Sequence, residues 1–408
     1  MHEIYPRLSV DEALEQILAH VRPLEPERVP ILEALGRVLA EDVYAEYDIP
    51  PLSNSAMDGY AVIAADTTGA SAERPARLQV IHDLPAGYTT DLTVTSGTAV
   101  RIMTGAPVPA GADTVVPFEQ TEQTGEWVSI LEPFGVGENI RVAGEDVRRG
   151  ELILKQGTLM RAQEVGMLAA LGHSTALVIR RPRVGILATG DEVVDIEEPL
   201  RPGKIRNANS YSNAAQVLQF GGVPVILGIA RDNVDEITAR IRDGLNQGID
   251  LLLTSGGISV GDFDVVKKVL AAEGEMEFWQ VKMRPGKPFA FGQIGGVPLL
   301  GLPGNPVSAM VSFYNFARPA ILKMLGRDDH RPARVRATLE DPVTKRKGFR
   351  FYFRVMLEQR DGAYYARLTG EQGSGILLSM VRAQGLAIVP EDLDGLDAGA
   401  TVEVWLLN

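Results

Sequence analysis

Cysteine is absent from the 408 residues of the chain, and histidine occurs five times. The absence of cysteine excludes disulfides, a thiolate nucleophile and cysteine-ligated zinc. The histidines are scattered and none lies in a glycine-rich motif, so a surface or packing role accounts for each of them. Any chemistry must therefore come from carboxylates, Lys and Arg side chains, hydroxyls and backbone amides, with a hard cation where one is needed.

Long apolar runs are also missing. No run approaches the roughly 18 residues that a membrane span needs. The first residues, MHEIYPRLSVDEALEQILAH, include early acidic side chains and no apolar signal-peptide core, so we expect a cytoplasmic protein. Hydrophobic residues make up 45% and charged residues 23%, which is typical of a globular protein. At roughly 150 residues per domain, the length predicts two to four domains.

Net positive charge is lacking as well. The formal charge is −13, which argues against non-specific binding to nucleic acids or membranes. Basic residues nevertheless concentrate between Arg331 and Arg354, where eight Lys and Arg outnumber two acidic residues, a local charge of +6. Two interpretations stand side by side: a solvated charged face, or the place where an anionic ligand docks.

The pattern of the first 180 residues predicts two domains. A capping box at Ser9 and Glu12 begins a first helix, and ILEALGRVLAEDV predicts a second. A further helix is expected over 161–171, ended by Gly172. Short β-rich runs with Gly and Pro turns lie between these parts. We therefore predict an elongated helical N-terminal domain formed by 1–46 and 146–180, with a β domain inserted at 47–145.

The remaining sequence predicts an α/β domain followed by a small β domain. From residue 182 onward, buried strands such as RVGILATG alternate with helices of 10–15 residues. Such alternation is typical of parallel βαβ units, so we predict a doubly wound three-layer α/β domain at 181–327. After it, FRFYFRVMLEQ and AYYARLTG predict a hairpin across Arg360-Asp361-Gly362, within a C-terminal β domain at 328–408.

Four unusual turns follow strands of the α/β domain: ATGDEV, ARDN, TSGGISVGDFD and LPGNPVS. Ligands of open α/β sheets bind beyond the carboxyl ends of the strands, so we expect one cleft at this edge. The glycine loop matches neither a Walker A loop nor the dinucleotide fingerprint. Gly256 and Gly257 permit close backbone approach, and the helix starts after them and at Asn305-Pro306 present free N–H groups to an anion.

Both signs of charge accompany these turns. Arg284 and Lys287, around Pro285-Gly286, are candidates for phosphate contact. Carboxylates beside phosphates repel unless a divalent cation bridges them, which is the usual Mg²⁺ arrangement. The residues therefore indicate a nucleotide-like or phosphorylated ligand with Mg²⁺. The carboxylates in question are those of Glu192, Asp232, Asp262 and Asp264. Two simpler interpretations remain open: Asp232 caps its helix with Asp235 completing a box, and Asp262 caps the next one.

Outside the α/β domain, PPLSNSAMDGYAV (50–62) packs Asn54, Ser55 and Asp58 among glycine and prolines. A functional loop and a β-turn with Asx capping both account for this stretch.

Taken together, these stretches resemble the molybdopterin molybdenumtransferase family, the MoeA type, whose eukaryotic relative is the E domain of gephyrin. The resemblance runs in family order over essentially the whole chain. It is carried by SNSAMDGYAV, RIMTGAPVPAGADTVV, NIRVAGEDVRRGE, RVGILATGDEVV, IRNANSY, TSGGISVGDFDVVKKVL, MRPGKPFAFG, GLPGNPVSAMVSFYNFARP and GEQGSGILLSM.

The resemblance implies the last step of molybdenum cofactor synthesis. In that family, adenylylated molybdopterin and molybdate are joined with Mg²⁺, and AMP and molybdenum cofactor are released. It also implies a homodimer whose cleft is completed by the other subunit. Molybdopterin adenylyltransferase and acceptor molybdoenzymes are further implied partners, without nucleic acid or membrane.

Motif matching assigns the candidate residues. As catalytic residues it implies Asp58, Thr104, Glu192, Asp232 and Asp264, of which Glu192, Asp232 and Asp264 are also the expected metal ligands. Asp146 matches a further functional position. To substrate binding we assign Gly256, Gly257, Ser259, Arg284, Lys287, Pro303, Asn305, Pro306, Arg354 and Ser374.

Arg284 stands where the family often has lysine, so the charge is kept while the contact geometry changes. Two other functions were weighed. A molybdopterin adenylyltransferase needs only the α/β domain, and the additional domains argue against it. A non-catalytic scaffold for a peptide partner has no specific support in the sequence.

Overall fold

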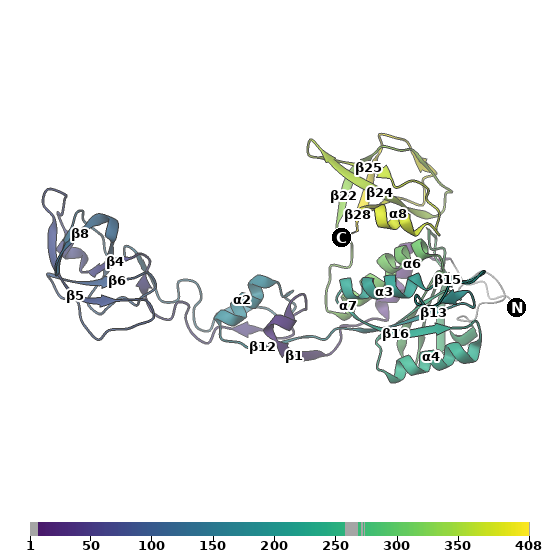
Figure 1. Cartoon of the computed structure of the whole chain (residues 1–408), viewed down its shortest axis with the longest axis horizontal. Helices are drawn as coiled ribbons and strands as arrows, with labels where there is room; N and C mark the ends of the chain where they lie inside the picture. The colour runs from purple at the N-terminus through teal and green to yellow at the C-terminus, as the bar shows by residue number, and fades with distance from the viewer. Residues whose placement is uncertain (1–6, 258–267, 271, 273, 408) are drawn as a thin grey trace. The chain divides into compact units, whose positions relative to one another are not determined.

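The computed structural model describes residues 7–257, 268–270, 272 and 274–407 (Figure 1). The chain divides into two compact units. The first contains Met1–Ala40, Leu159–Ala162 and Thr175–Asn408, and the second contains Glu41–Thr158 and Gln163–Ser174. This division does not test the four predicted domain boundaries. No helix in the described part of the chain is long and apolar enough to cross a membrane.

The second unit is built on a six-stranded half-barrel sheet in the order β7-β4-β6-β5-β9-β8. Only β5 and β6 are parallel neighbours in this sheet. Alternate residues of β4 enter two apolar clusters, Tyr60 and Val62 on one face and Ala61 on the other, so both faces of the sheet are buried. The strands are β4 Gly59–Val62, β5 Ala76–Leu84, β6 Thr98–Ile102, β7 Thr114–Pro117, β8 Thr121–Thr124 and β9 Trp127–Ile130.

The N-terminal region contains less helix than predicted. The capping box is confirmed at α1 (Val10–Ala19), and the third predicted helix is α2 (Ala162–Ala170), closed by Gly172 at φ +79°. The second predicted helix is wrong: only a 3₁₀ turn, η1 (Ile31–Ala34), forms, because Gly36 at φ +75° turns the chain away. Paired short strands replace it: β1 Pro26–Pro30 with β12 Thr175–Ile179, β2 Val43–Tyr44 with β11 Leu152–Leu154, and β3 Asn54–Ser55 with β10 Ile140–Arg141.

The first unit contains the α/β sheet, in the order β16-β13-β17-β21-β20-β18. The first four strands are mutually parallel, as predicted. One apolar cluster packs α1, α3, α6 and α7 on one face, and a second cluster includes α4 on the other. The strands are β13 Arg183–Thr189, β16 Val223–Ala230, β17 Leu251–Ser255, β18 Gly274–Gln280, β20 Pro288–Ile294 and β21 Val297–Leu302. The helices are α3 Ala208–Gln219, α4 Val234–Asn246, α6 Pro306–Ser312 and α7 Arg318–Met324, with a π-helical turn η4 (Phe313–Ala317) between the last two.

The sheet is mixed, because its last two strands depart from the predicted pattern of parallel βαβ units. β20 is antiparallel to both β21 and β18. Gly295 and Gly296, at φ +58° and +80°, form the two-residue connection between β20 and β21. Two consecutive residues with positive φ are typical of a tight hairpin turn, and this glycine pair is the sequence signal that the periodicity argument missed.

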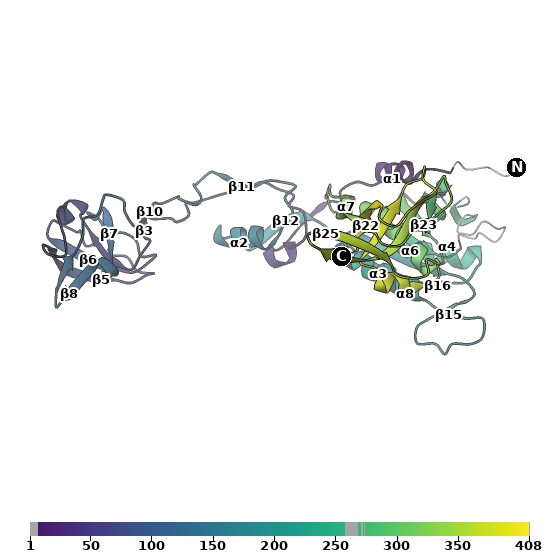
Figure 2. The same ribbon diagram turned by 90° about the horizontal axis from the view of Figure 1, so that it is seen from above.

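The C-terminal part is a closed five-stranded barrel in the order β24-β25-β22-β28-β26, with β26 pairing back to β24. The predicted hairpin is confirmed as β24–β25, and Asp361 and Gly362 turn it at φ +49° and +80°. Figure 2 shows this barrel beside the α/β layers of the same unit, and β19 (Met283–Arg284) joins the two parts by pairing with β24. The barrel elements are β22 Arg334–Leu339, β24 Arg350–Arg360, β25 Ala363–Leu368, β26 Gly385–Val389, β28 Thr401–Leu406 and α8 Leu377–Arg382. A small ladder joins β23 Val343–Thr344 with β27 Gly395–Leu396, and β14 Val193–Val194 pairs with β15 Ile205–Arg206 beside the sheet.

Candidate functional site

The carboxyl ends of β13, β16, β17 and β21 meet at one edge, because these strands are parallel neighbours. A cavity of about 350 Å³ lies there, which we call the edge cavity. Its lining includes Glu192, Gly256, Asn305 and Pro306, so four predicted residues from three turns are brought together. The expected cleft at this edge is therefore present.

Gly256 is needed for the close approach of two strand ends. It adopts φ +91°, and its N–H donates to the carbonyl of Leu302 at 3.2 Å. A Cβ at this position would lie 2.4 Å from the carbonyl oxygen of Thr189. A side chain there would therefore push β17 away from β13. Gly257 follows at φ +64°, and Pro303 lies buried between β21 and α6.

The helix starts correct the prediction for Asp232 and confirm the positions predicted for Asn305 and Pro306. Asn233 caps α4 by accepting from the N–H of Glu236 at 2.8 Å, so the interpretation of Asp232 as the cap is wrong. Asn305 occupies the cap position of α6 with Pro306 in its first turn, but its side chain makes no capping hydrogen bond. Its amide instead donates to Ser374 Oγ at 3.2 Å, so it links the edge cavity to the barrel loop.

Three carboxylates gather at the acidic side of the edge. Partial burial and the nearby Asp191 and Glu192 raise the pKa of Asp232 above its usual value. The N–H of Asp232 donates to Asp191 Oδ1 at 3.4 Å. Sequence reasoning did not single out Asp191, although it directly precedes Glu192 in the ATGDEV turn.

The predicted Mg²⁺ fits this set of carboxylates only if waters and the substrate supply the rest of its ligands. Within the described ranges, no group of three His, Asp or Glu side chains could hold a metal by itself. Mg²⁺ is commonly bound through one or two carboxylates, with waters and substrate phosphates completing its coordination. Burial first, and then repulsion by Asp191 and Glu192, raise the pKa of Asp232, and a cation bound there would relieve this repulsion. Asp262, Asp264 and Ser259 lie outside the described residues, so their predicted roles stay predictions.

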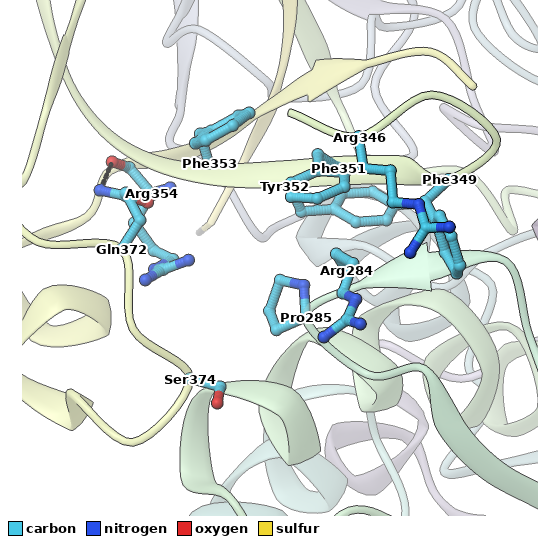
Figure 3. A pocket seen from close by; sticks show the side chains of 10 residues that line it. All are labelled: Arg284, Pro285, Arg346, Phe349, Phe351, Tyr352, Phe353, Arg354, Gln372 and Ser374. Carbon is cyan, nitrogen blue, oxygen red and sulfur yellow. Dashed lines mark hydrogen bonds between the residues drawn. The ribbon is translucent and has the colours of Figure 1, made fainter. Parts of the chain in front are cut away.

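A second cavity, of about 300 Å³, lies where the loop after β19 faces β24 of the barrel (Figure 3). We call it the arginine cavity, because Arg284, Arg346 and Arg354 line it. Its other lining residues are Pro285, Phe349, Phe351, Tyr352, Phe353, Gln372 and Ser374. Predicted binding residues from three distant segments thus meet in one place.

Arg354 is the most unusual charge of the cavity. Its side chain is 1% exposed, and burial lowers its pKa to about 10. Its Nε donates to Ser379 Oγ and its Nη2 to the carbonyl of Gly373, both at 3.1 Å. Within the described residues it forms no ion pair with a carboxylate. A buried guanidinium with neutral partners alone is the arrangement that an anionic ligand would complete.

A further basic side chain, that of Lys287, lies near two of the cavity arginines, Arg284 and Arg346. Burial and the nearby charges of Arg7, Arg284 and Arg346 lower the pKa of Lys287. The guanidinium carbon of Arg284 lies 5.7 Å from the ring centre of Phe349. Arg346 belongs to the basic segment of the sequence, so that segment serves the cavity in part. The segment also contains solvated charges, since the exposed Arg334 pairs with Glu403 at 3.0 Å.

The two cavities share one loop. Ser374 lines the arginine cavity, and Gly375, the next residue, lines the edge cavity. The N–H of Val307, at the start of α6, donates to the carbonyl of Ser374 at 3.1 Å. The candidate site of the first unit is therefore one region with an acidic and a basic part.

The remaining predicted residues lie in the second unit. Thr104 donates to Asp58 Oδ1 twice, from its N–H and its hydroxyl, both at 2.7 Å. These hydrogen bonds, with the backbone one foremost, lower the pKa of Asp58. Ser55 folds the same loop by donating to the carbonyl of Met57 at 2.5 Å. Asp58 and Thr104 are thus paired, whereas Asp146 is exposed, with its N–H bonded to the carbonyl of Ile49 at 3.0 Å.

Comparison with known families first defines the class. Residues 185–323 match the probable molybdopterin binding domain, and residues 8–172 and 336–407 match the MoeA N-terminal region (domain I and II) and the MoeA C-terminal region (domain IV). The edge cavity and most of the α/β sheet lie within the first of these matches. The chain is thus a molybdopterin-binding protein whose flanking regions are also of the MoeA type.

Full-length relatives then define the family. Molybdopterin molybdenumtransferase 2 of Mycobacterium tuberculosis (strain ATCC 25618 / H37Rv) is 39% identical over 98% of this chain and 100% of the relative. The Bacillus subtilis (strain 168) molybdopterin molybdenumtransferase is 35% identical over 98% and 94%. A crystal structure of the molybdopterin biosynthesis moea protein from Pyrococcus horikosii superimposes with a TM-score of 0.86 at 33% identity, covering 99% of this chain and 100% of that one.

The chain therefore belongs to the MoeA-type molybdopterin molybdenumtransferase family, and it is a molybdopterin molybdenumtransferase of molybdenum cofactor biosynthesis. This finding sets aside the adenylyltransferase and scaffold alternatives.

Proposed function

We propose that the chain inserts molybdate into adenylylated molybdopterin in the presence of Mg²⁺, and that AMP and molybdenum cofactor are released. The observation that carries the proposal is the buried Arg354, which has no carboxylate partner among the described residues and lines one cavity with Arg284 and Ser374. Molybdate and phosphates are oxyanions, and a guanidinium with free N–H groups in a low-dielectric cavity binds such groups strongly.

The edge cavity supports the same reaction from its acidic side. Gly256 and Gly257 leave room for a phosphorylated pterin, and Glu192 and Asp232 offer oxygen ligands for a shared cation. Together with Asp264, these carboxylates would hold Mg²⁺, which would neutralise the charge of the substrate phosphates. The dithiolene sulfurs belong to the substrate, so the metal insertion needs no cysteine of the chain.

Asp58 and Thr104 form the third part of the proposed site. The two hydrogen bonds from Thr104 hold the Asp58 carboxylate ionised and in one orientation. In the implied homodimer, this loop would complete the cleft of the other subunit. Sedimentation of the purified protein would check the homodimer, and a monomer would contradict it.

The decisive experiment supplies purified protein with adenylylated molybdopterin, Mg²⁺ and molybdate, and measures AMP. We expect AMP release that depends on molybdate and that a chelator abolishes. AMP release without molybdate, or tight substrate binding without turnover, would refute the proposal.

A further inference from the structure

One residue of the arginine cavity has an unusual set of partners. β25 ends at Leu368, which pairs with Val355 of β24, so Arg354 lies just past the last pair of this ladder. The N–H of Thr369 still donates to the carbonyl of Arg354 at 3.1 Å, and then the chain leaves the strand. The N–H of Arg354 is consequently without a partner from β25.

The side chain of Gln372 takes the place of the missing strand residue. Its Oε1 accepts from the N–H of Arg354 at 2.8 Å, and its Nε2 donates to the carbonyl of Arg354 at 3.3 Å. The same Nε2 reaches the carbonyl of Gly370 at 3.0 Å and Thr369 Oγ1 at 3.4 Å. One amide thus satisfies the peptide groups of Arg354 and ties them to the departing loop (Figure 3).

This loop also makes the inner wall of the cavity. The carbonyl of Gly373 accepts from Arg354 Nη2, and Ser374 lines the cavity one residue later. Gln372 therefore bonds to the backbone of Arg354, and the adjacent Gly373 accepts a hydrogen bond from the guanidinium of the same residue. If the amide is lost, the loop can separate from β24. Arg354 and Ser374 are then no longer held in a fixed position relative to each other.

We propose that Gln372 is a positioning residue for oxyanion binding, and that it acts by clamping the loop carrying Gly373 and Ser374 to the backbone of Arg354. The proposal rests on the proposed function, because it assigns molybdate to the arginine cavity. The amide of Gln372 is hydrogen-bonded to the backbone of Arg354 and to the loop. Gln372 therefore affects oxyanion binding through Arg354 and Ser374.

The chain offers a matched control on the same strand. Gln384 Oε1 accepts from the N–H of Leu357 at 2.8 Å, the same amide-to-strand bond three residues further along β24. Gln384 does not line the arginine cavity. Gln372→Leu and Gln384→Leu therefore remove the same kind of hydrogen bond, one inside the cavity wall and one outside it.

The test measures molybdate binding by calorimetry, and the KM for molybdate, on the full-length wild type and both variants. For Gln372→Leu we expect the Kd and the KM for molybdate to rise on the order of tenfold, which corresponds to the free energy of about one hydrogen bond. The KM for adenylylated molybdopterin should stay near the wild-type value. Gln384→Leu should leave the molybdate Kd unchanged, although urea unfolding should show a stability loss in both variants, larger for Gln372→Leu because its amide makes additional hydrogen bonds.

A second substitution separates positioning from folding. Gln372→Glu keeps an acceptor for the N–H of Arg354 but removes the donor and places a carboxylate beside the guanidinium. We expect a folded protein that binds molybdate more weakly than Gln372→Leu.

Wild-type affinity in Gln372→Leu, or equal losses in Gln372→Leu and Gln384→Leu, would overturn the inference and leave the proposed function intact. If the wild type itself fails to bind molybdate, the proposed function and the inference both fall.

Discussion

Replacing Arg354 by methionine should abolish the activity while leaving the protein about as stable as the wild type. Burial lowers the pKa of Arg354 from its usual value to about 10, which corresponds to a cost of about 3 kcal/mol for keeping the side chain charged. The guanidinium donates two hydrogen bonds, to Ser379 and Gly373, each contributing about 1.5 kcal/mol, the lower end of the range for a bond to a charged group. The two effects nearly cancel, so we expect a change in unfolding free energy within about 1 kcal/mol.

The sign of the pH dependence follows from the same pKa. The lowered pKa means that the folded state disfavours the charged form. This cost is fully present below pH 10, where the arginine is charged in both the folded and unfolded states. The difference in unfolding free energy between wild type and Arg354→Met should therefore be the same at pH 6 and pH 8. Only above about pH 10 should the wild type gain stability relative to the variant.

Urea unfolding followed by tryptophan fluorescence measures the stability, and AMP release measures the activity. Arg37 is the matched control: it is equally buried at 4% exposure, but it pairs with Glu27 at 2.5 Å and donates to the carbonyl of Ile179. Arg37→Met should lose on the order of 3 kcal/mol, because it breaks an ion pair and leaves the carbonyl without its donor. Saturating molybdate should stabilise the wild type, by about 2.7 kcal/mol at a hundredfold excess over Kd, and should not stabilise Arg354→Met.

A loss of 3–5 kcal/mol in Arg354→Met would show that Arg354 has a stabilising partner in the folded chain, and the reasoning would be refuted. Retained molybdate-dependent AMP release would equally refute the assignment of Arg354 to the oxyanion.

Three further predictions concern the other candidate residues. Asp232→Asn should raise the unfolding free energy at pH 7, because burial, Asp191 and Glu192 raise the pKa of Asp232. This gain in stability should disappear as the pH falls below the usual carboxyl pKa of 3.8, and a gain that persists at lower pH would contradict this cause. Gly256→Ala should lower the unfolding free energy by about 1–3 kcal/mol from its φ of +91° alone, and unchanged urea unfolding would show that the strand ends can separate freely. Asp58→Ala should lose AMP release while thermal unfolding stays cooperative, and full activity would remove Asp58 from the site.

The edge of the α/β sheet was predictable because its geometry follows from a periodic pattern. Alternating strands and helices imply parallel strands, and parallel strands bring their carboxyl ends together. Glu192, Gly256 and Asn305, which are 64 and 49 residues apart in the sequence, could be placed in one cavity on that argument. The same pattern carries no information about individual partners, so the unusual bond from Asn305 to Ser374 and the role of Asn233 as the α4 cap were missed.

The arginine cavity was beyond pattern reasoning for a physical reason. It forms where β19 pairs with β24, two segments that are 66 residues apart in the sequence and are separated along it by the last strands and helices of the α/β domain. The resemblance to known family members supplied Arg354 and Ser374, whereas Arg346, Gln372 and the phenylalanine lining are visible only in the folded chain. The basic composition of 331–354 was a usable signal, yet it mixed cavity residues with surface ion pairs such as Arg334–Glu403.

The two cavities carry opposite charges, a distribution that suits two ligands of opposite charge side by side. Glu192 and Asp232 repel an anion at the sheet edge, while Arg284 and Arg354 repel a free cation in the neighbouring cavity. In the proposed reaction, a phosphorylated substrate carrying Mg²⁺ would place positive charge beside the carboxylates, and an oxyanion would place negative charge beside the guanidinium. Ser374 and Gly375 are neighbours on one loop and line the two cavities, so the two ligands would bind side by side. Each ligand would then relieve the repulsion among the like charges of its own cavity. A reaction that joins an oxyanion to a phosphorylated, metal-bound substrate is therefore the kind of chemistry for which this distribution of charge is suited.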